Sequence, residues 1–202
     1  MPDVVTGMLS LPKPSDYWTT DPNRCFPELI VAKTTKQRNN QSVFDHTMHV
    51  LDALSSKNEV TLLAALSHDL GKTETADSSY SRFPNHAEKS VIIARRRLQL
   101  WQSPSETIDS ICRIINMHMF DTTLPLPDKT INKFVAKVGP DNIDDWFVLR
   151  IADSASYRYR GAYCKRYINP FRVVIDQYLD KLPSTAQFID KETDTGMQIS
   201  GK

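Results

Sequence analysis

The chain has 202 residues, of which 40% are hydrophobic and 24% are charged, so it is long enough for one sizeable core and ordinary for a globular protein. Its formal net charge of +1 gives only a weak overall field, so a charged partner must be recognised by a local patch. No stretch reaches the ~20 apolar residues that span a bilayer, and the first residues lack the basic and apolar regions of a signal peptide, so we expect no contact with a membrane.

The first segment, residues 1–23, is rich in proline. It carries Pro12, Pro14 and Pro22 among Ser, Thr and Asp residues. This composition predicts an extended N-terminal arm with little helix.

Helical spacing of apolar residues starts in the next segment. Val43, Val50 and Leu54 recur at roughly helical intervals, and Ser42 is a suitable N-cap. Residues 60–72 (VTLLAALSHDLGK) are nearly all apolar up to the histidine and stop at the glycine. This pattern predicts a buried helix whose C-terminal turn opens into a pocket.

Further helices follow along the chain. Residues 85–102 are amphipathic, and the next helix begins after Pro104 with an isoleucine stripe. We expect the remaining helices at about 128–138, 141–160 and 170–181. Strand signals are weak, so the sequence predicts an all-α single domain over residues 24–182, followed by a polar C-terminal tail, 183–202.

The three cysteines, Cys25, Cys112 and Cys164, are odd in number, far apart and not in CxxC spacing. They are typical of buried thiols in a reducing compartment and do not suggest a disulfide framework. The expected location is therefore cytoplasmic.

The side chains that carry chemistry lie mostly at the ends of the predicted helices. One histidine lies near a helix start, a His-Asp pair ends the next helix, two histidines open and close the following helices, and an aspartate lies in a late helix. These are His46, His68, Asp69, His86, His118 and Asp153. Imidazole and carboxylate together suit Fe, Mn, Co, Ni or Zn. Six such ligands exceed the need of one tetrahedral zinc and would suffice for two ions, with Asp69 between them.

Two metals ~3.5–4 Å apart can lower the pKa of a bridging water and neutralise charge on a phosphate under attack. Lys72, one turn beyond the His-Asp pair, is placed to contact a phosphoryl oxygen. The sequence therefore predicts Asp69 and Lys72 as catalytic residues, with Lys72 also binding substrate.

The order H…HD…H…H…D, with HDLGK at 68–72, resembles the motif of the HD superfamily. The similarity covers roughly residues 25–160 and extends to the HD domain of bacterial CCA-adding tRNA nucleotidyltransferases and to HD modules fused to polynucleotide kinases. It is carried by CFPELIVAKTTKQRNNQSVFDHTMHVLDAL, LLAALSHDLGK, FPNHAEKSVIIARRRLQLW, RIINMHM and RIADSAS.

This resemblance implies a helical HD domain with a metal site at the centre of its helices. It implies that a metal-activated water hydrolyses 2′,3′-cyclic phosphates and 2′-phosphates on nucleotides or RNA 3′ ends. The metals would be two divalent ions (Mn, Fe, Co or Ni, with Mg possible), held by the six side chains named above. No nucleotidyltransferase half is expected, because Asp141, Asp144 and Asp145 have the wrong spacing for its paired aspartates.

Several assignments within the site stay open. If only one metal binds, His86 and His118 would contact substrate instead. His49 is a weaker candidate ligand, and Asp121 and Asp145 compete with Asp153 for the last position. Asp153 is favoured because its helix neighbours are apolar.

A run of arginines and tyrosines follows Asp153. Arginine forks match phosphates and tyrosines can stack on bases, although the tyrosines could equally pack on the core with the arginines reaching into solvent. Arg158 is the best single candidate for a phosphate or nucleotide contact.

Three other functions compete with the leading one. A 5′-nucleotidase would need the same metals with different pocket walls. An HD-type di-iron oxygenase would activate O₂ instead of water, and a non-catalytic nucleotide sensor would have lost ligands. The sequence does not indicate an oligomeric state.

Overall fold

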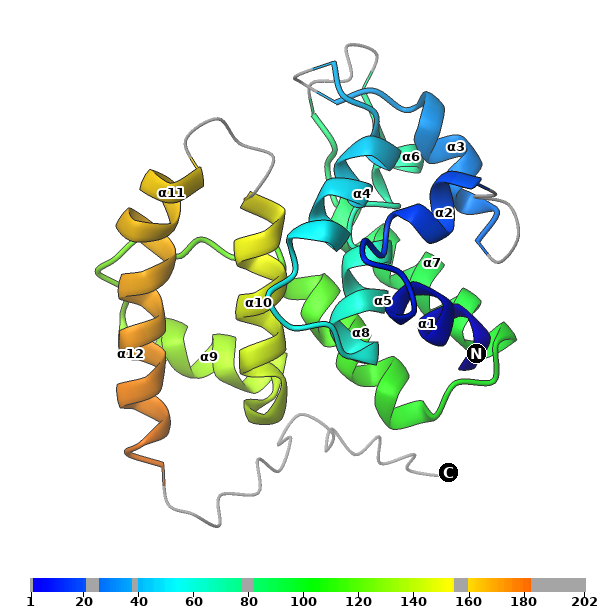
Figure 1. Ribbon diagram of the computed structural model, residues 1–202. Helices are drawn as coiled ribbons and strands as arrows, with labels where there is room; N and C mark the ends of the chain where they lie inside the picture. The colour runs from blue at the N-terminus through cyan, green and yellow to red at the C-terminus, as the bar shows by residue number, and fades with distance from the viewer. Residues whose placement is uncertain (1, 21–25, 38–39, 78–81, 155–159, 183–202) are drawn as a thin grey trace, which may run out of the picture.

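The computed structural model describes residues 2–20, 26–37, 40–77, 82–154 and 160–182 (Figure 1). Every regular element in these ranges is helical, and the pairing of Lys36 with Ser42 is an isolated bridge. The predicted all-α class is therefore confirmed for this part of the chain. None of its helices is long and apolar enough to cross a membrane.

The elements follow one another in this order: α1 (Pro2–Leu9), α2 (Asp16–Thr20), α3 (Glu28–Thr34), α4 (Val43–Ala53), α5 (Glu59–Ser67), α6 (Lys72–Thr75), α7 (His86–Leu100), α8 (Ser105–Met117), α9 (Asp128–Val138), a 3-10 turn (Pro140–Asn142), α10 (Ile143–Asp153), α11 (Arg160–Tyr163), a π-helical turn (Cys164–Ile168) and α12 (Asn169–Leu179).

The N-terminal segment differs from the extended arm expected from its prolines. Residues 2–20 contain α1 and α2, and the side chains of Met8 and Trp18 are fully buried in the core. The Trp18 indole N–H also donates a hydrogen bond to the Met8 sulfur at 3.1 Å. Pro12 and Pro14 fall between the two helices, where proline costs a helix nothing, so the prolines separate short helices instead of preventing them.

Helix α5 forms the centre of the molecule. All its residues from Thr61 to Ser67 are buried, and it packs against α4, α8 and α10. Its N-terminus is closed by a capping box between Asn58 and Thr61. The predicted N-cap of α4 is also present, because the Ser42 hydroxyl accepts a hydrogen bond from the Asp45 amide at 2.9 Å.

Gly71 marks the close approach of the chain after α5 to the start of α7. Its φ of −61° is ordinary, so it is not needed as a left-handed helix cap. A Cβ at this position would lie 2.1 Å from the His86 carbonyl oxygen and 2.6 Å from the Ser90 amide nitrogen. The Gly71 amide donates to the Ser90 hydroxyl at 2.8 Å, which holds the two segments together.

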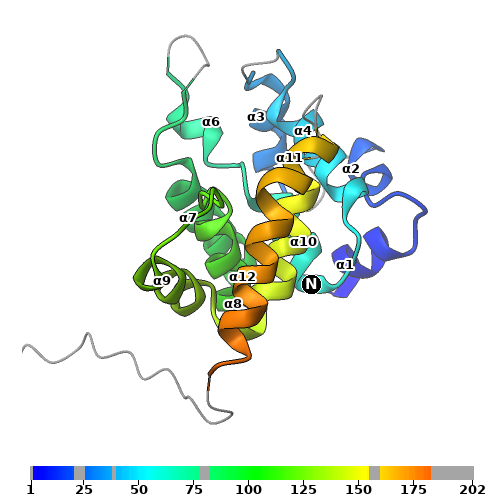
Figure 2. The same ribbon diagram turned by 90° about the vertical axis from the view of Figure 1, so that its left-hand side faces the viewer.

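A second group of buried rings joins α9, α10 and α12; α9 crosses between α10 and α12 in Figure 1, and α12 lies in front of α10 in Figure 2. The Phe134, Trp146 and Phe171 rings have centroids 4.8–6.1 Å apart. Helix α10 ends at Asp153, earlier than the predicted 141–160, and residues 155–159 lie outside the described residues.

The cysteines agree in part with the expected buried thiols. Cys112 is buried and Cys164 is half-buried, and both are free of disulfides. Cys25 and the predicted tail, 183–202, lie outside the described part of the chain.

Candidate metal centre

The six predicted side chains lie together, although they come from five separate parts of the chain. His46 is in the first turn of α4, the His-Asp pair directly follows α5, and His86 is the first residue of α7. His118 directly follows α8, and Asp153 is the last residue of α10. All six side chains are buried, and burying so many polar groups together is costly unless they are paired with one another or bind a metal.

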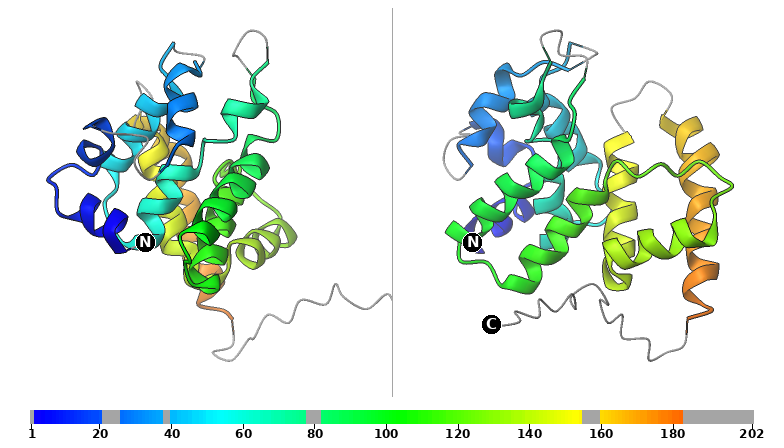
Figure 3. Two further views of the ribbon diagram at one scale, coloured as in Figure 1. Left: turned by 90° about the vertical axis from the view of Figure 1, so that its right-hand side faces the viewer. Right: turned by 180° about the vertical axis from the view of Figure 1, so that it is seen from behind.

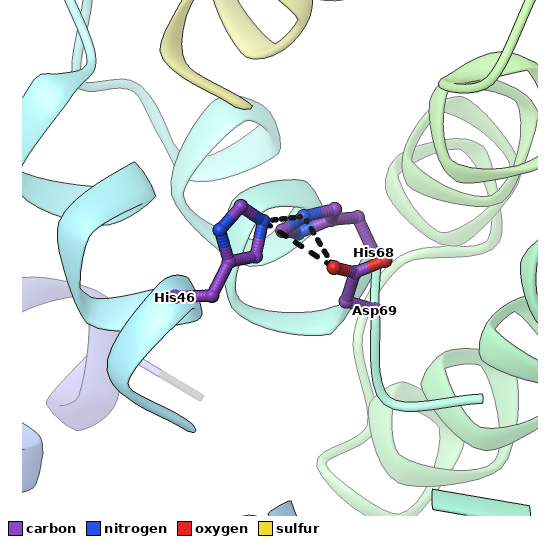
Figure 4. Close-up of side chains that lie close together, drawn as sticks. All are labelled: His46, His68 and Asp69. Carbon is purple, nitrogen blue, oxygen red and sulfur yellow. Dashed lines mark hydrogen bonds and ion pairs between the residues drawn. The ribbon is translucent and has the colours of Figure 1, made fainter. Parts of the chain in front are cut away.

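The first half of the cluster is formed by His46, His68 and one oxygen from each aspartate. The two histidine Nε2 atoms are 3.3 Å apart (Figure 4). Asp69 Oδ2 lies 3.3 Å from His46 Nε2 and 3.4 Å from His68 Nε2. Asp153 Oδ1 lies 3.1 Å and 3.7 Å from the same two nitrogens. We call these four atoms the first subsite.

The second half is formed by His86, His118 and the other oxygen of Asp69. The two Nε2 atoms are 3.3 Å apart, and Asp69 Oδ1 lies 3.5 Å from the first and 3.6 Å from the second. We call these three atoms the second subsite. The Asp69 carboxylate is therefore shared, with one oxygen turned to each subsite.

Backbone carbonyls fix the proton on three of the four imidazoles. The Nδ1 atoms of His68, His86 and His118 lie 2.7–2.8 Å from the carbonyl oxygen of the residue three positions earlier. A carbonyl oxygen only accepts, so each Nδ1 carries a proton, and a neutral ring in this tautomer would offer the Nε2 lone pair to a metal. These lone pairs lie in the cluster beside carboxylate oxygens, which is the arrangement of metal ligands.

The spacing of the atoms in each subsite fits one ion bound by all of them. Ligand atoms about 2.1 Å from one ion lie about 3.0 Å apart in octahedral and about 3.4 Å apart in tetrahedral geometry. Of the separations in the two subsites, those of 3.1–3.4 Å lie within this range, and the longest, 3.5–3.7 Å, exceed it by about 0.3 Å or less. In addition, Asp69 Oδ1 is buried without a hydrogen-bond partner, although a buried carboxylate oxygen without one is costly. Both observations fit an ion in the second subsite as well as the first.

The electrostatics keep the two carboxylates ionised. Burial raises the pKa of Asp69, but the Lys72 ammonium and the neighbouring histidines outweigh it and hold that pKa well below its usual range. Burial likewise raises the pKa of Asp153, and the hydrogen bond with His46 together with the nearby His68 ring brings it well below the usual range. Burial lowers the pKa of His86, against the opposing effect of the Asp69 carboxylate, so its ring favours the neutral form that a metal requires.

Lys72 lies beside the shared carboxylate, three residues after it in the sequence. Its Nζ donates to Asp69 Oδ2 at 2.6 Å and to the Gln37 amide oxygen at 2.7 Å. The ammonium also lies 5.5 Å from the centre of the Phe83 ring. The side chain is 14% exposed, so it lies at the boundary between the buried cluster and solvent.

Arg150 supports Asp153 and was not found by sequence reasoning. Its guanidinium donates to Asp153 Oδ2 at 3.3 Å and to the Tyr163 hydroxyl at 2.8 Å. Asp153 Oδ2 is thereby engaged, and Oδ1 remains directed toward the histidines. The spacing of Arg150 three residues before Asp153, on one helix face, is the only sequence signal that could have indicated this contact.

The weaker candidates lie outside the cluster. His49 is exposed and hydrogen-bonded to Gln41. Asp145 accepts a hydrogen bond from the Asn58 amide, and exposed Asp121 accepts one from the Thr123 backbone. Arg158 lies outside the described residues.

The comparisons with known proteins place this cluster in context. The family model described as HD domain matches residues 42–157, which is more than half of the chain and includes all six clustered side chains. No curated protein and no solved structure matches the chain.

Proposed function

The chain belongs to the HD domain family, and from that premise we propose that it hydrolyses 2′,3′-cyclic phosphates and 2′-phosphates on nucleotides or RNA 3′ ends. HD domains as a family are metal-dependent phosphohydrolases that bind divalent metals. The observation that carries the proposal is the Asp69 carboxylate, whose two oxygens face two different pairs of histidines.

The six side chains would hold two ions, with Asp69 as the shared ligand. His46, His68 and Asp153 complete the first subsite, and His86 and His118 complete the second. A mixed nitrogen and oxygen set favours Mn, Fe, Co or Ni, and fits Mg less well because Mg prefers oxygen ligands. When bound, such ions supply an acidified water at neutral pH and neutralise charge on the reacting phosphate.

The remaining groups would bind and orient the substrate. Lys72 is anchored to Asp69 on one side and to the neutral amide oxygen of Gln37 on the other. An anionic phosphoryl oxygen is a stronger acceptor than an amide, so we propose that Lys72 exchanges Gln37 for the substrate. Arg158 is retained as a second proposed phosphate contact.

The protein purified without chelators provides the test. Opening of 2′,3′-cyclic AMP would be followed by chromatography, and phosphate release from 2′-AMP, 3′-AMP and 5′-AMP by a colorimetric assay, each with added Mn, Co, Ni or Mg. Metal content per chain would be measured on the same preparation. Turnover of 2′,3′-cyclic AMP or 2′-AMP with two metals per chain is the expected result.

Two outcomes would contradict the proposal. Phosphate release from 5′-AMP alone would indicate a 5′-nucleotidase, and two irons without hydrolysis of any ester would indicate oxygen chemistry. Asp69→Ala and His68→Ala are expected to abolish activity while keeping the helical circular-dichroism spectrum. His49→Ala is the matched control, since this histidine is exposed and outside the cluster.

We also propose a cytoplasmic location. It is supported by Cys112 and Cys164, which are both free thiols, as expected in a reducing compartment.

A further inference from the structure

A groove of about 1020 Å³ lies on α7, α8 and α9, the helices seen from behind in the right-hand view of Figure 3. Each helix contributes residues at positions i, i+3, i+4 and i+7, that is, one face. On α7 this face runs from Glu88 to Arg95, and on α8 from Asp109 to Asn116. We call it the α7–α9 groove.

The groove is separate from the metal centre. Arg95 follows His86 by nine residues, and Asp109 precedes His118 by nine residues. At 3.6 residues per turn, nine residues place two side chains roughly half a turn apart around a helix. The helices α7 and α8 therefore present their histidines on one face and the groove on the other.

The charge of the groove is strongly positive. Five cationic side chains and two carboxylates line it, which gives +3, although the whole chain carries only +1. Of the two carboxylates, Asp109 is already paired with Arg95 at 2.8 Å. Among the described residues, no carboxylate forms an ion pair with any of the three lysines on α9.

These three lysines form a regular row. Lys129, Lys133 and Lys137 are exposed and follow one another at intervals of four residues. With a rise of 1.5 Å per residue, neighbouring lysines are about 6 Å apart along the helix and the row is about 12 Å long. Ile92, which is 60% exposed, adds an apolar contact on the opposite wall. A row of cations of this length suits the evenly spaced phosphates of an extended polyanion better than one compact ligand.

One end of the groove lies at the same ends of α7 and α8 as the metal centre, but on the opposite face. Glu88 lies two residues after His86 and Asn116 lies two residues before His118, so a strand that leaves the groove here would pass round these helix ends to reach the cluster. We infer that the α7–α9 groove binds the phosphate backbone of a single RNA strand whose 3′ end is presented to the metal centre. The binding follows from the charge and shape, and the presentation of the 3′ end rests on the proposed function.

The test neutralises the lysine row. The variant Lys129→Gln/Lys133→Gln/Lys137→Gln keeps good helix-forming residues at exposed positions. The matched control, Lys13→Gln/Lys57→Gln/Lys181→Gln, makes the same change in net charge at exposed positions outside the groove. Fluorescence anisotropy with a labelled 12-nucleotide RNA ending in a 3′-hydroxyl measures binding without hydrolysis.

We expect the groove variant to bind this RNA about tenfold more weakly at 0.1 M salt. The slope of log binding constant against log salt concentration should be smaller in magnitude by about 2, since each lost phosphate contact lowers it by about 0.7 for a single strand. The control variant should bind like the unmodified protein. Hydrolysis of an RNA with a 2′,3′-cyclic end should fall with RNA affinity, whereas hydrolysis of 2′,3′-cyclic AMP should not change.

The outcomes separate this inference from the proposed function. If the unmodified protein hydrolyses no phosphate ester but loses RNA affinity in the groove variant, the groove inference stands and the proposed function fails. Equal RNA affinity of both variants would overturn the inference. So would equally tight binding of polyglutamate, which would indicate an acidic protein partner. If the unmodified protein binds no RNA but sediments as a dimer that the groove variant does not form, the groove is an interface between copies of the chain. That result would also overturn the inference.

Discussion

The second subsite can be tested by removing His118 alone. This side chain is 1% exposed and supplies one of the three ligand atoms of that subsite. In His118→Ala only His86 and Asp69 remain there, while the first subsite keeps all four of its atoms. We therefore expect metal content to fall from two ions per chain to one.

The magnitude follows from the contacts. Disturbing only the groups that support a ligand costs about 10–100-fold in metal affinity, so losing the ligand itself should cost more than ~100-fold, or about 2.7 kcal/mol. Without metal, the variant loses the hydrogen bond from Nδ1 to the Ile115 carbonyl and leaves a small cavity, at about 1–3 kcal/mol. For a chain of this size that corresponds to a fall of about 2–12 °C in Tm, which leaves the protein folded.

The assay is elemental analysis after dialysis against a defined concentration of Mn or Ni, with Tm in chelator recorded in parallel. His49→Ala, an exposed histidine bound to Gln41, should keep both ions. If the unmodified protein and His118→Ala both hold one ion, the second subsite binds no metal and the dinuclear argument is wrong.

Three other changes test single contacts. Lys72→Met removes the proposed phosphoryl contact. Because a charge-assisted hydrogen bond contributes about 1.5–3 kcal/mol, we expect kcat/KM to fall about 10–100-fold at unchanged metal content, and unaltered kinetics would contradict the role of Lys72. Arg150→Met removes the hydrogen bond to Asp153, so metal affinity should fall about 10–100-fold and activity should return at high metal concentration. A loss of activity that saturating metal does not restore would argue that Arg150 does not position Asp153. Gly71→Ala places a Cβ 2.1 Å from the His86 carbonyl oxygen, so the free energy of unfolding should fall by about 1–3 kcal/mol in a denaturant titration, and equal stability would refute this packing.

The central helices could be predicted from the sequence because their apolar spacing and their caps agree. The 128–138 helix was predicted with the bounds that α9 has, and Ser42 is the cap of α4. The N-terminal helices are not predictable from their proline-rich composition, because burial in the core and not local propensity holds them. Helix α1 is held by the burial of Met8 against Trp18, and a contact between distant residues leaves no local periodicity.

The candidate site was predictable in its identities but not in its supports. Histidine and aspartate are few and chemically distinctive, so their order along the chain was enough to group them. The contact between Lys72 and Gln37 could not be predicted, because Gln37 is 35 residues away and has no distinctive sequence context. The same holds for the α7–α9 groove, since three helix faces that are unremarkable in sequence become one basic surface only when they pack.

The placement of the cluster at helix termini explains how one arrangement serves both stability and chemistry. Helices α5, α8 and α10 all end at the cluster, and the last carbonyls of a helix have no partner within it. His68 and His118 each satisfy one such carbonyl, Ala65 and Ile115, with Nδ1. The same bond leaves Nε2 bare for a metal. Three helix C-termini, each equivalent to about half a negative charge, favour cations at this point, and the N-termini of α4 and α7 at His46 and His86 oppose them. The positive charge of the ions would therefore be balanced mainly by the Asp69 and Asp153 carboxylates, while the helix ends supply the carbonyls that orient the imidazoles.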